Sequence, residues 1–154
     1  MRVGPLLDEQ LCFALYAATN AVTRAYRPLL GALGLTYPQY LVMMVLWQDG
    51  ASTIQTIARR LRLGANAITP LIDRLEAAGL VARGQSATDR RVVRAILTAA
   101  GEALRDEVSK AQDSVGCQIA LSADAVAALR AELLALTDRM APAVMGNRHS
   151  IPAE

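Results

Sequence analysis

Apolar and polar positions alternate at helical spacing along most of this chain. From Pro5 to about Leu30, apolar residues recur every three to four positions, which predicts a long first helix. The apolar face of that helix is formed by Leu11, Leu15, Ala18, Val22, Ala25 and Leu29. Thr36 and Gln39 then form a capping box at the start of a second helix. Because Tyr40–Trp47 is almost wholly apolar, we expect this second helix to lie in the middle of the core.

Residues 52–98 have the pattern of a winged helix-turn-helix, with two helices around a tight turn and then a two-stranded ribbon. Ser52 and Gln55 form a capping box before the first of these helices, which ends at Leu61. The second helix is expected at Ala65–Ala78, and the strands at Leu80–Arg83 and Val92–Leu97. Such a second helix has the length to enter a major groove, and the ribbon can reach the neighbouring minor groove.

Charge is concentrated on the same segment. Residues 52–98 carry eight arginines and three acidic residues, a net charge of +5, whereas the whole chain carries +2. A concentration of positive charge on one module indicates a polyanionic partner, here double-stranded DNA. The alternative is a solvated, arginine-rich surface with no partner.

The exposed side of the Ala65–Ala78 helix offers few polar groups, so sequence readout should rely on DNA shape and on the ribbon. Asn66 can bond to an adenine edge and the Thr69 methyl can contact thymine, although Asn66 could instead cap the helix. In the loop between the strands, Asp89 is expected to hold the guanidinium of Arg91 in a bidentate pair, so that Arg91 enters a narrow minor groove. Further DNA contacts are expected from Arg74 and Arg90.

A second stripe runs beside the apolar face of the first helix, formed by Cys12, Tyr16, Thr19, Thr23 and Tyr26. A thiol, two phenols and hydroxyl groups on one stripe are unusual for a core face. In a continuous helix, Cys12 and Tyr26 lie about 21 Å apart, so they cannot touch within one chain. A second copy of the helix crossing antiparallel near Thr19 would bring Cys12 of one subunit to Tyr26 of the other. The stripe therefore predicts a homodimer.

Thr98 and Ser122 are expected to cap two further helices. The helix after Thr98 has its apolar face at Leu104, Val108, Ala111 and Val115. The helix after Ser122 carries a coiled-coil seam of Val126, Leu129, Leu133, Leu136 and Met140. A seam of this kind requires a partner helix, which again favours a dimer. We expect one domain over residues 1–154, with dimerisation helices at 1–35 and 99–154 around the DNA-binding region at 52–98.

Composition excludes several classes of protein. No apolar run approaches the roughly 20 residues that a membrane span needs, and the N-terminus does not have the pattern of a signal peptide. The two cysteines do not form a secreted disulfide framework. We therefore expect a cytoplasmic protein without membrane association. The only histidine, His149, lies in a tail (146–154) that we expect to be frayed, and we expect neither a metal site nor a cofactor.

Several blocks of this sequence resemble the organic hydroperoxide sensors of the MarR family. The blocks are Leu11–Tyr16, Ala25–Leu30, Gly34–Tyr40, Thr69–Leu71, Arg74–Leu80 and Asp89–Arg91. The resemblance covers roughly residues 8–105. It implies a mostly α-helical, homodimeric winged-helix repressor with six helices and a small β-wing. The chain departs from the family pattern at Gly64–Ala67, where relatives are richer in Asp, Ser and Thr, so the operator sequence does not follow from the resemblance.

The same resemblance implies that Cys12 is the thiol that reacts with organic hydroperoxides. It also implies that Tyr26 and Tyr37 of the partner subunit hydrogen-bond to this thiol, that Tyr16 lies in the same pocket, and that Cys117 is the partner's resolving thiol. Phenol donors and a nearby helix N-terminus favour the reactive thiolate. Its first product is a sulfenic acid, which a second thiol can convert to a disulfide. Forming that bond would move helices, respace the two DNA-binding regions and release the operator.

Three other interpretations remain open. The chain could be a MarR-type regulator released by a non-covalent, small aromatic or lipophilic ligand, with Cys12 only lining the pocket. It could be a thiol peroxidase, although it has no recycling Cys-x-x-Cys pair and its basic region would then have no role. The cysteines could also be small apolar residues of the core. We favour the peroxide-sensing repressor and expect no enzymatic activity.

Overall fold

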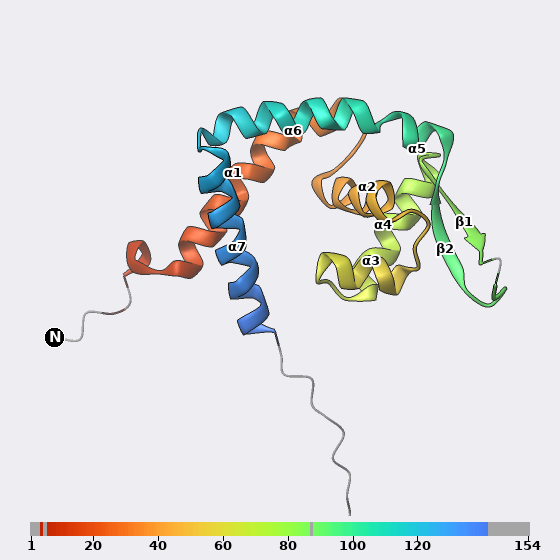
Figure 1. Cartoon of the computed structure of the whole chain (residues 1–154), viewed down its shortest axis with the longest axis horizontal. Coiled ribbons are helices and arrows are strands. Elements are labelled where there is room, and N and C mark those ends of the chain that lie inside the picture. The colour runs from red at the N-terminus through yellow and green to blue at the C-terminus, as the bar shows by residue number, and fades with distance from the viewer. Residues whose placement is uncertain (1–3, 5, 87, 142–154) are drawn as a thin grey trace, which may run out of the picture. The chain divides into compact units, whose positions relative to one another are not determined.

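The computed structural model describes residues 4, 6–86 and 88–141, and the chain divides into two compact units, residues 1–118 and 119–154. The first unit is mostly helical, and a two-stranded ribbon extends beside α2, α3 and α4 (Figure 1). Its elements are η1 (Leu7–Glu9), α1 (Leu11–Gly31), α2 (Tyr37–Asp49), α3 (Ile54–Leu61), α4 (Ala65–Ala77), β1 (Val81–Gln85), β2 (Val93–Leu97), α5 (Ala99–Ala103) and α6 (Arg105–Ile119). The predicted mostly α-helical fold with a β-wing is confirmed. The tail that we expected to be frayed, with His149, lies outside the described residues.

The first long helix begins later than predicted. Gln10 has an extended backbone (φ −89°, ψ 120°), so the 3-10 turn η1 is separated from α1, which starts at Leu11 rather than near Pro5. Cys12 is therefore in the first turn of α1, where backbone N–H groups have no partner within the helix. At the other end, Pro28 lies inside α1, which continues to Gly31.

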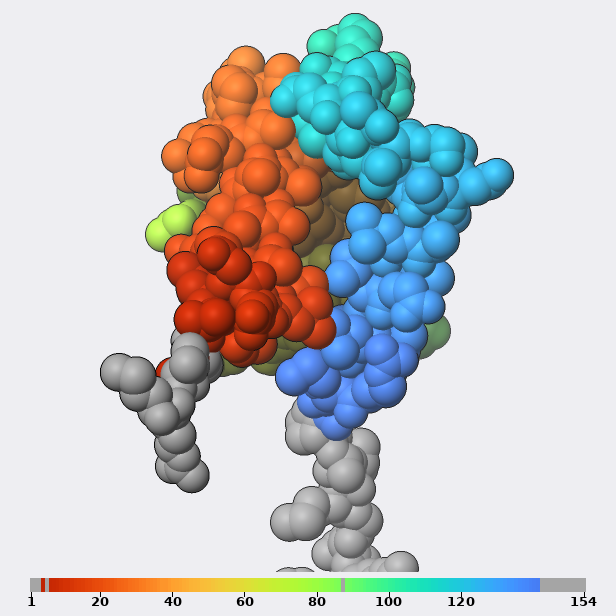
Figure 2. All heavy atoms as spheres, turned by 90° about the vertical axis from the view of Figure 1, so that its left-hand side faces the viewer, coloured from red at the N-terminus to blue at the C-terminus, as the bar shows by residue number. Residues whose placement is uncertain are grey.

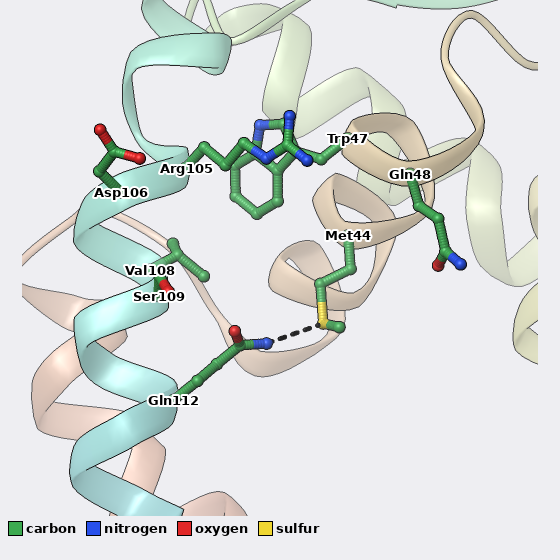
Figure 3. A pocket seen from close by; sticks show the side chains of 8 residues that line it. All are labelled: Met44, Trp47, Gln48, Arg105, Asp106, Val108, Ser109 and Gln112. Atoms are coloured by element: carbon green, nitrogen blue, oxygen red, sulfur yellow. Dashed lines mark hydrogen bonds between the residues drawn. The ribbon is translucent and has the colours of Figure 1, made fainter.

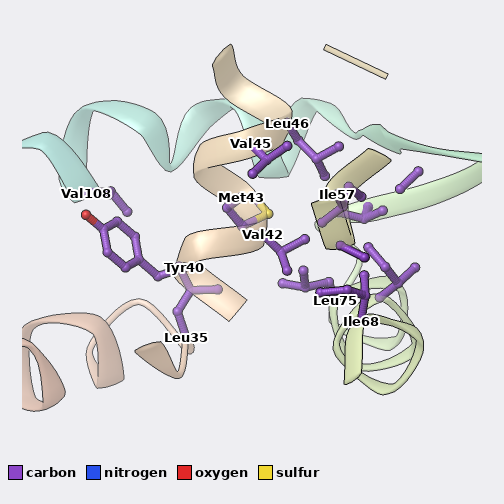
Figure 4. Close-up of a cluster of buried hydrophobic side chains, with 14 of the residues drawn as sticks. Leu35, Tyr40, Val42, Met43, Val45, Leu46, Ile57, Ile68, Leu75 and Val108 are labelled. Atoms are coloured by element: carbon purple, nitrogen blue, oxygen red, sulfur yellow. The ribbon is translucent and has the colours of Figure 1, made fainter. Parts of the chain in front are cut away.

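Helix α2 is the centre of the core, as its apolar sequence predicts. The capping box at its start is confirmed: Gln39 N–H donates to Thr36 Oγ1 at 3.4 Å, and Thr36 N–H donates to Gln39 Oε1 at 2.8 Å. Five side chains of α2 are at most 5% exposed: Tyr40, Val42, Met43, Val45 and Leu46. Figure 4 shows these side chains among apolar residues from α3 and α4. Because α2 is buried over most of its circumference, the other elements of this unit are positioned against it.

The capping box predicted at Ser52 and Gln55 is wrong. Thr53 caps α3 instead, since its side-chain oxygen accepts from Thr56 N–H at 3.1 Å. Ser52 is paired with Ala95 of β2: Ser52 N–H donates to Ala95 O and Ala95 N–H donates to Ser52 O, with nitrogen-to-oxygen distances of 3.1 and 2.8 Å. The pairing draws Ser52 into an extended segment along the ribbon, which moves the helix start one residue along the chain.

The turn between α3 and α4 is closed by backbone geometry. Arg62 has a left-handed backbone (φ 56°), and Leu63 N–H donates to Ala58 O at 2.9 Å. Helix α4 begins at Ala65, and its inward side is fully buried. That side consists of Ile68, Ile72 and Leu75, each 0% exposed. The helix-turn-helix predicted from the sequence is confirmed.

The ribbon follows directly. Strands β1 and β2 are antiparallel, with Val81 opposite Leu97 and Gln85 opposite Val93. Both predicted strands are confirmed; β1 starts and ends later than predicted, and β2 starts one residue later. Val81 and Ala95 are buried beneath the ribbon, which fixes the base of the wing against the core.

The predicted helix after Thr98 consists of two consecutive helices, α5 and α6, that meet at Leu104. Thr98 caps α5 as predicted, because its Oγ1 accepts from Gly101 N–H at 3.1 Å. In the second unit, Ser122 caps α7 (Ala123–Met140) through Ala125 N–H at 3.2 Å, also as predicted. No residue of α7 is buried, and its predicted seam stays open, with Leu129 51% and Met140 75% exposed.

Gly101 is a point of close packing at the base of the wing. A Cβ atom there would lie 2.1 Å from the carbonyl oxygen of Leu80, and the Gly101 carbonyl accepts from the Trp47 indole at 3.1 Å. We predict that Gly101→Ala lowers the free energy of unfolding by about 2–3 kcal/mol, because backbone must shift. Urea denaturation of the reduced protein measures this change.

Gly116→Ala is the matched control. Nothing lies within 4 Å of a Cβ at Gly116, which is inside α6. This substitution should therefore raise the free energy of unfolding by about 0.5–1 kcal/mol, since Ala favours a helix. A Gly101→Ala protein as stable as wild type would contradict the packing argument.

Candidate functional site

Three tyrosines from α1 and α2 meet in one group, which we call the tyrosine cluster: Tyr26, Tyr37 and Tyr40. Ring centroids are 5.4 Å apart for Tyr26–Tyr37 and Tyr26–Tyr40, and 5.5 Å apart for Tyr37–Tyr40. Tyr26 and Tyr40 are stacked at 28°. The structure thus brings together two predicted site residues, Tyr26 and Tyr37. Sequence reasoning missed Tyr40, because its apolar surroundings in the sequence predict a core residue. Its position three residues after Tyr37 on one helix could have indicated that the two side chains are neighbours.

The environment of the cluster favours the protonated phenols of Tyr26 and Tyr37. Burial raises the pKa of Tyr26 well above its ordinary value of 10.0, and the charge of Tyr40 and a hydrogen bond with it raise this pKa further. Burial also raises the pKa of Tyr37, with a second contribution from the charge of Tyr40. Both phenols can therefore donate hydrogen bonds throughout the physiological pH range.

Gln112 connects the tyrosine cluster to α6. Its Nε2 donates to the hydroxyl of Tyr40 at 2.7 Å. The same nitrogen lies 3.7 Å from the sulfur of Met44 (Figure 3). Tyr40 is only 3% exposed, so this bond satisfies a buried hydroxyl group that would otherwise carry a desolvation cost. The same helix carries Cys117 just over one turn further on.

An open cavity of about 590 Å³ lies beside Tyr37, between the C-terminal half of α1 and the start of α2. It is lined by Thr23, Arg27, Gly31, Leu35, Thr36, Tyr37 and Pro38. The lining combines apolar groups with the hydroxyls of two threonines, one phenol and a guanidinium. A thiol that entered this cavity would meet the phenol of the cluster.

Both cysteines are free and exposed, so neither is a small apolar residue of the core of the chain. Tyr16 is 67% exposed. Helix α1 is continuous between Cys12 and Tyr26, which places them about 21 Å apart at 1.5 Å per residue. The structure therefore does not bring Cys12 and Tyr16 to the tyrosine cluster of their own chain. Figure 2 shows the N-terminal half of α1, in red, open on the surface.

The predicted DNA-contacting residues of α4 share its exposed side. Asn66, Thr69 and Arg74 are all exposed. The Thr69 hydroxyl donates to Ala65 O at 3.3 Å, which leaves its methyl group for an outside contact. Asn66 is not the helix cap, because Gly64 occupies that position. Of the two roles considered for Asn66, capping is thus removed.

The tip of the wing differs from prediction. Asp89 Oδ1 accepts the backbone N–H of Arg91 at 2.9 Å, so the predicted bidentate pair with the Arg91 guanidinium is wrong. The physical reason is proximity. The short Asp89 side chain reaches the backbone N–H two residues further on more readily than it reaches the guanidinium at the end of the Arg91 side chain. Arg90 and Arg91 are both exposed, and no ion pair within the described part of the chain engages either of them.

Sequence reasoning also missed Arg83, which joins β1 to α4. Its guanidinium donates to the carboxylates of Asp73 and Glu76, and its backbone N–H donates to Glu76 Oε1 at 3.2 Å. The hydrogen bond to Asp73 is the largest of the effects that raise the pKa of Arg83. The available signal was the short turn between α4 and β1, which places oppositely charged residues side by side.

A second cavity, of about 400 Å³, lies between α2 and α6 (Figure 3). It is lined by Met44, Trp47, Gln48, Arg105, Asp106, Val108, Ser109 and Gln112. Figure 3 shows Arg105 and Gln112 projecting from α6 toward α2. The wall of this cavity is partly apolar, with groups from both helices, and partly polar, with groups mainly from α6. No cluster of His, Cys, Asp and Glu in the described ranges could hold a metal ion, and no helix there is long and apolar enough to cross a membrane.

Comparison with known proteins assigns the family. Residues 35–93 match the model of the MarR family. The chain is 42% identical over 134 residues to the HTH-type transcriptional regulator TtmR of Methylorubrum extorquens PA1, covering 87% of this chain and 69% of that protein. This chain belongs to the MarR family. It is also similar to the organic hydroperoxide resistance transcriptional regulator of Bacillus subtilis 168, at 40% identity over 75% of this chain and 77% of that protein.

Solved structures agree with this assignment to the MarR family. AbfR of Staphylococcus epidermidis is 32% identical, with a TM-score of 0.72 over 86% of this chain and 92% of that one. Reduced AbfR bound to DNA is also similar, with a TM-score of 0.70 at 30% identity over 86% of this chain and 93% of that one. The chain is therefore a MarR-type transcriptional regulator with a winged-helix fold.

The raised tyrosine pKa values predict a pH dependence of stability. In the unfolded chain tyrosines titrate near 10.0, whereas the folded state holds the protons of Tyr26 and Tyr37 more tightly. The resulting stabilisation is complete below pH 10.0 and is lost as pH rises above it. The free energy of unfolding of the wild type should therefore fall more steeply than that of Tyr26→Phe between about pH 9 and about pH 11.

Urea denaturation across this pH range measures the two slopes. Equal slopes for wild type and Tyr26→Phe would contradict the raised pKa.

Proposed function

We propose that this MarR-family regulator is a homodimeric repressor that senses organic hydroperoxides. With Cys12 reduced, the dimer binds double-stranded operator DNA, and oxidation of Cys12 releases it. One observation carries the proposal. The structure groups three phenols beside an open cavity, yet Cys12 of the same chain lies about 21 Å from Tyr26 along α1. A second copy of α1, crossing antiparallel, supplies the missing thiol.

Exposed apolar surface in each unit supports the dimer. In α1 only Leu30 is buried, although the helix has an apolar face, and Leu11 is 61% exposed. In the second unit, an apolar cavity of about 330 Å³ is lined by Ile119, Leu121, Val126, Leu129, Arg130, Leu133 and Leu134. Apolar helix faces of this size are stabilised when another helix covers them. We therefore assign residues 1–35 and 99–154 to dimerisation and 52–98 to DNA binding.

In the proposed reaction, the Cys12 thiolate attacks one oxygen of the hydroperoxide. The O–O bond breaks, the alcohol leaves after taking up a proton, and Cys12 becomes a sulfenic acid. Tyr26 and Tyr37 of the partner subunit donate hydrogen bonds to the thiolate and keep it charged. Tyr16 lines the same pocket. The thiol of Cys117 of the partner subunit then condenses with the sulfenic acid, so that a disulfide forms and water leaves.

The proposed DNA contacts follow the exposed side of α4 and the tip of the wing. Helix α4 enters the major groove with Asn66, Thr69 and Arg74, and the wing tip enters the minor groove. Asp89 stiffens that tip through the backbone of Arg91, while Arg91 inserts and Arg90 contacts the phosphates. AbfR, a similar protein, has been solved bound to DNA, which supports DNA binding by this chain.

The relatives support a redox signal. One relative is named as an organic hydroperoxide resistance regulator. AbfR has been solved reduced and overoxidised on DNA and in a disulfide form. These states belong to those proteins, and for this chain they favour a switch based on cysteine oxidation over one based on a bound ligand.

A gel-shift titration with cumene hydroperoxide tests the sensing thiol. Oxidation should weaken the binding of wild type to its operator by about fivefold to 150-fold, the usual range for coupled sites. Cys12→Ser should bind the same DNA and stay bound after peroxide. Release of both proteins at equal peroxide concentration would contradict the role of Cys12.

Non-reducing electrophoresis tests the second thiol. After one equivalent of organic hydroperoxide per subunit, wild type should run as a covalent dimer that dithiothreitol reverses. Cys117→Ser should stay monomeric on this gel while its Cys12 still reacts with a sulfenic-acid probe. A covalent dimer in Cys117→Ser would assign the bond to two Cys12 residues instead.

The cavity between α2 and α6 favours one second candidate, a regulator released by a small lipophilic or aromatic ligand. Arg105 gives this cavity a cation, and Trp47 and Met44 give it an apolar wall. In that case an aromatic carboxylate such as benzoate would release wild type and Cys12→Ser equally. Steady turnover of peroxide with excess dithiol, without DNA binding, would instead indicate a thiol peroxidase.

A further inference from the structure

We propose that Arg83 is a positioning residue that fixes the wing against α4 and lowers the repulsion between two carboxylates of α4 and DNA. The inference rests on DNA binding by this chain, as proposed above, and assigns a role to a residue outside the expected contact set. Three donor groups of Arg83 meet α4: two branches of its guanidinium and its backbone N–H. The acceptors are the carboxylates of Asp73 and Glu76.

Asp73 lies on the side of α4 that is proposed to face DNA. It follows Thr69 by four residues and Asn66 by seven, so the three share one helix face. Its side chain is 58% exposed, and that of Glu76 is 40% exposed. Two uncompensated carboxylates at this place would repel the phosphates that the arginines of the wing attract. The forked guanidinium of Arg83 bonds to both carboxylates, so that one positive charge offsets one of the two negative charges.

The same contacts restrain the wing. Arg83 lies within β1, opposite Ala95 of β2, so a bond from Arg83 to α4 acts on both strands. Glu76 holds the backbone and the side chain of Arg83 together. These bonds therefore fix the orientation of the ribbon relative to α4 at a second position, farther along the ribbon than its buried base. The distance between the groove-reading helix and the wing tip depends on that orientation.

Exposed ion pairs contribute little to folding stability, so the effect of Arg83 should appear in DNA binding and not in unfolding. A lysine at this place could neutralise charge but could not reach two carboxylates in a fixed fork. The matched comparison is Lys110, which forms an exposed ion pair with Glu107 on α6, outside the winged helix. Lys110→Gln changes the net charge by the same amount as Arg83→Gln.

A double-mutant cycle tests the proposal. The probe is a fluorescent duplex that the reduced wild type selects from a randomised pool, and the measurement is Kd at several salt concentrations. Arg83→Gln should weaken binding about tenfold, Arg83→Lys less, and Lys110→Gln by no more than about twofold. In a chain that also carries Asp73→Asn and Glu76→Gln, Arg83→Gln should cost no more than about threefold, because the charges that it compensates are gone.

The outcomes separate the possible roles. If Arg83 contacted a phosphate directly, Arg83→Gln would cost as much in the neutralised background as in wild type, and the proposal would be overturned. An Arg83→Gln protein with wild-type affinity, or one with a Tm lowered by more than about 5 °C, would overturn it as well. If the reduced wild type selects no duplex at all, DNA binding by this chain fails, and this result is distinct from a failure of the cycle.

Discussion

Burial of α2 over most of its circumference is the constraint on which the rest of the first unit depends. A helix without a polar face must be covered by other elements, and here α1, α3, α4 and β2 all pack against it. The residues that complete the core come from each of these elements, among them Leu30 of α1, Ile57 of α3 and Ile72 of α4. The winged helix and the tyrosine-bearing half of α1 are thus two sides of one core.

This arrangement places chemically different groups at the two ends of α2. Tyr37 and Tyr40 are in its first two turns, beside Tyr26. Near its other end, Trp47 bonds to Gly101 at the base of the wing. Between them, Tyr40 is bonded to Gln112 of α6. A packed helix transmits a displacement at one end to the other because core packing resists local deformation. In the proposed dimer, α2 would therefore connect the partner's Cys12 at the cluster to the DNA-binding surface.

Electrostatics in the winged helix follow a consistent division of roles. Asp49 pairs with Arg60 at 2.7 Å, and Asp73 and Glu76 pair with Arg83. Asp89 is used by the backbone of the wing tip. The acidic groups of this region are thus engaged by neighbouring groups, while Arg90 and Arg91 stay exposed at the tip. The positive charge that remains after these pairings includes the exposed arginines at the wing tip.

Local patterns in the sequence were sufficient for most of the secondary structure. Helical periodicity, the Thr36 and Thr98 caps and the short ribbon each depend on residues a few positions apart, and all are present. The sequence was also sufficient to show that Cys12 and Tyr26 cannot touch within one chain, because the helix rise per residue alone sets their separation. Tyr26 was identified from the stripe on the first helix and Tyr37 by resemblance to a family, and their proximity is a fact of the structure.

Tertiary structure decided the contacts between segments far apart in the chain. Ser52 lost its predicted capping role because Ala95 pairs with it, more than forty residues away. Tyr40 joined the site because α1 crosses the start of α2, and Arg83 meets α4 because the ribbon folds back on it. The sequence alone determined the local helices, caps and strands and the side chains that they carry, since local backbone preferences act over a few residues. Which groups meet was decided by packing around α2, because a long-range contact forms only where the core brings two segments together.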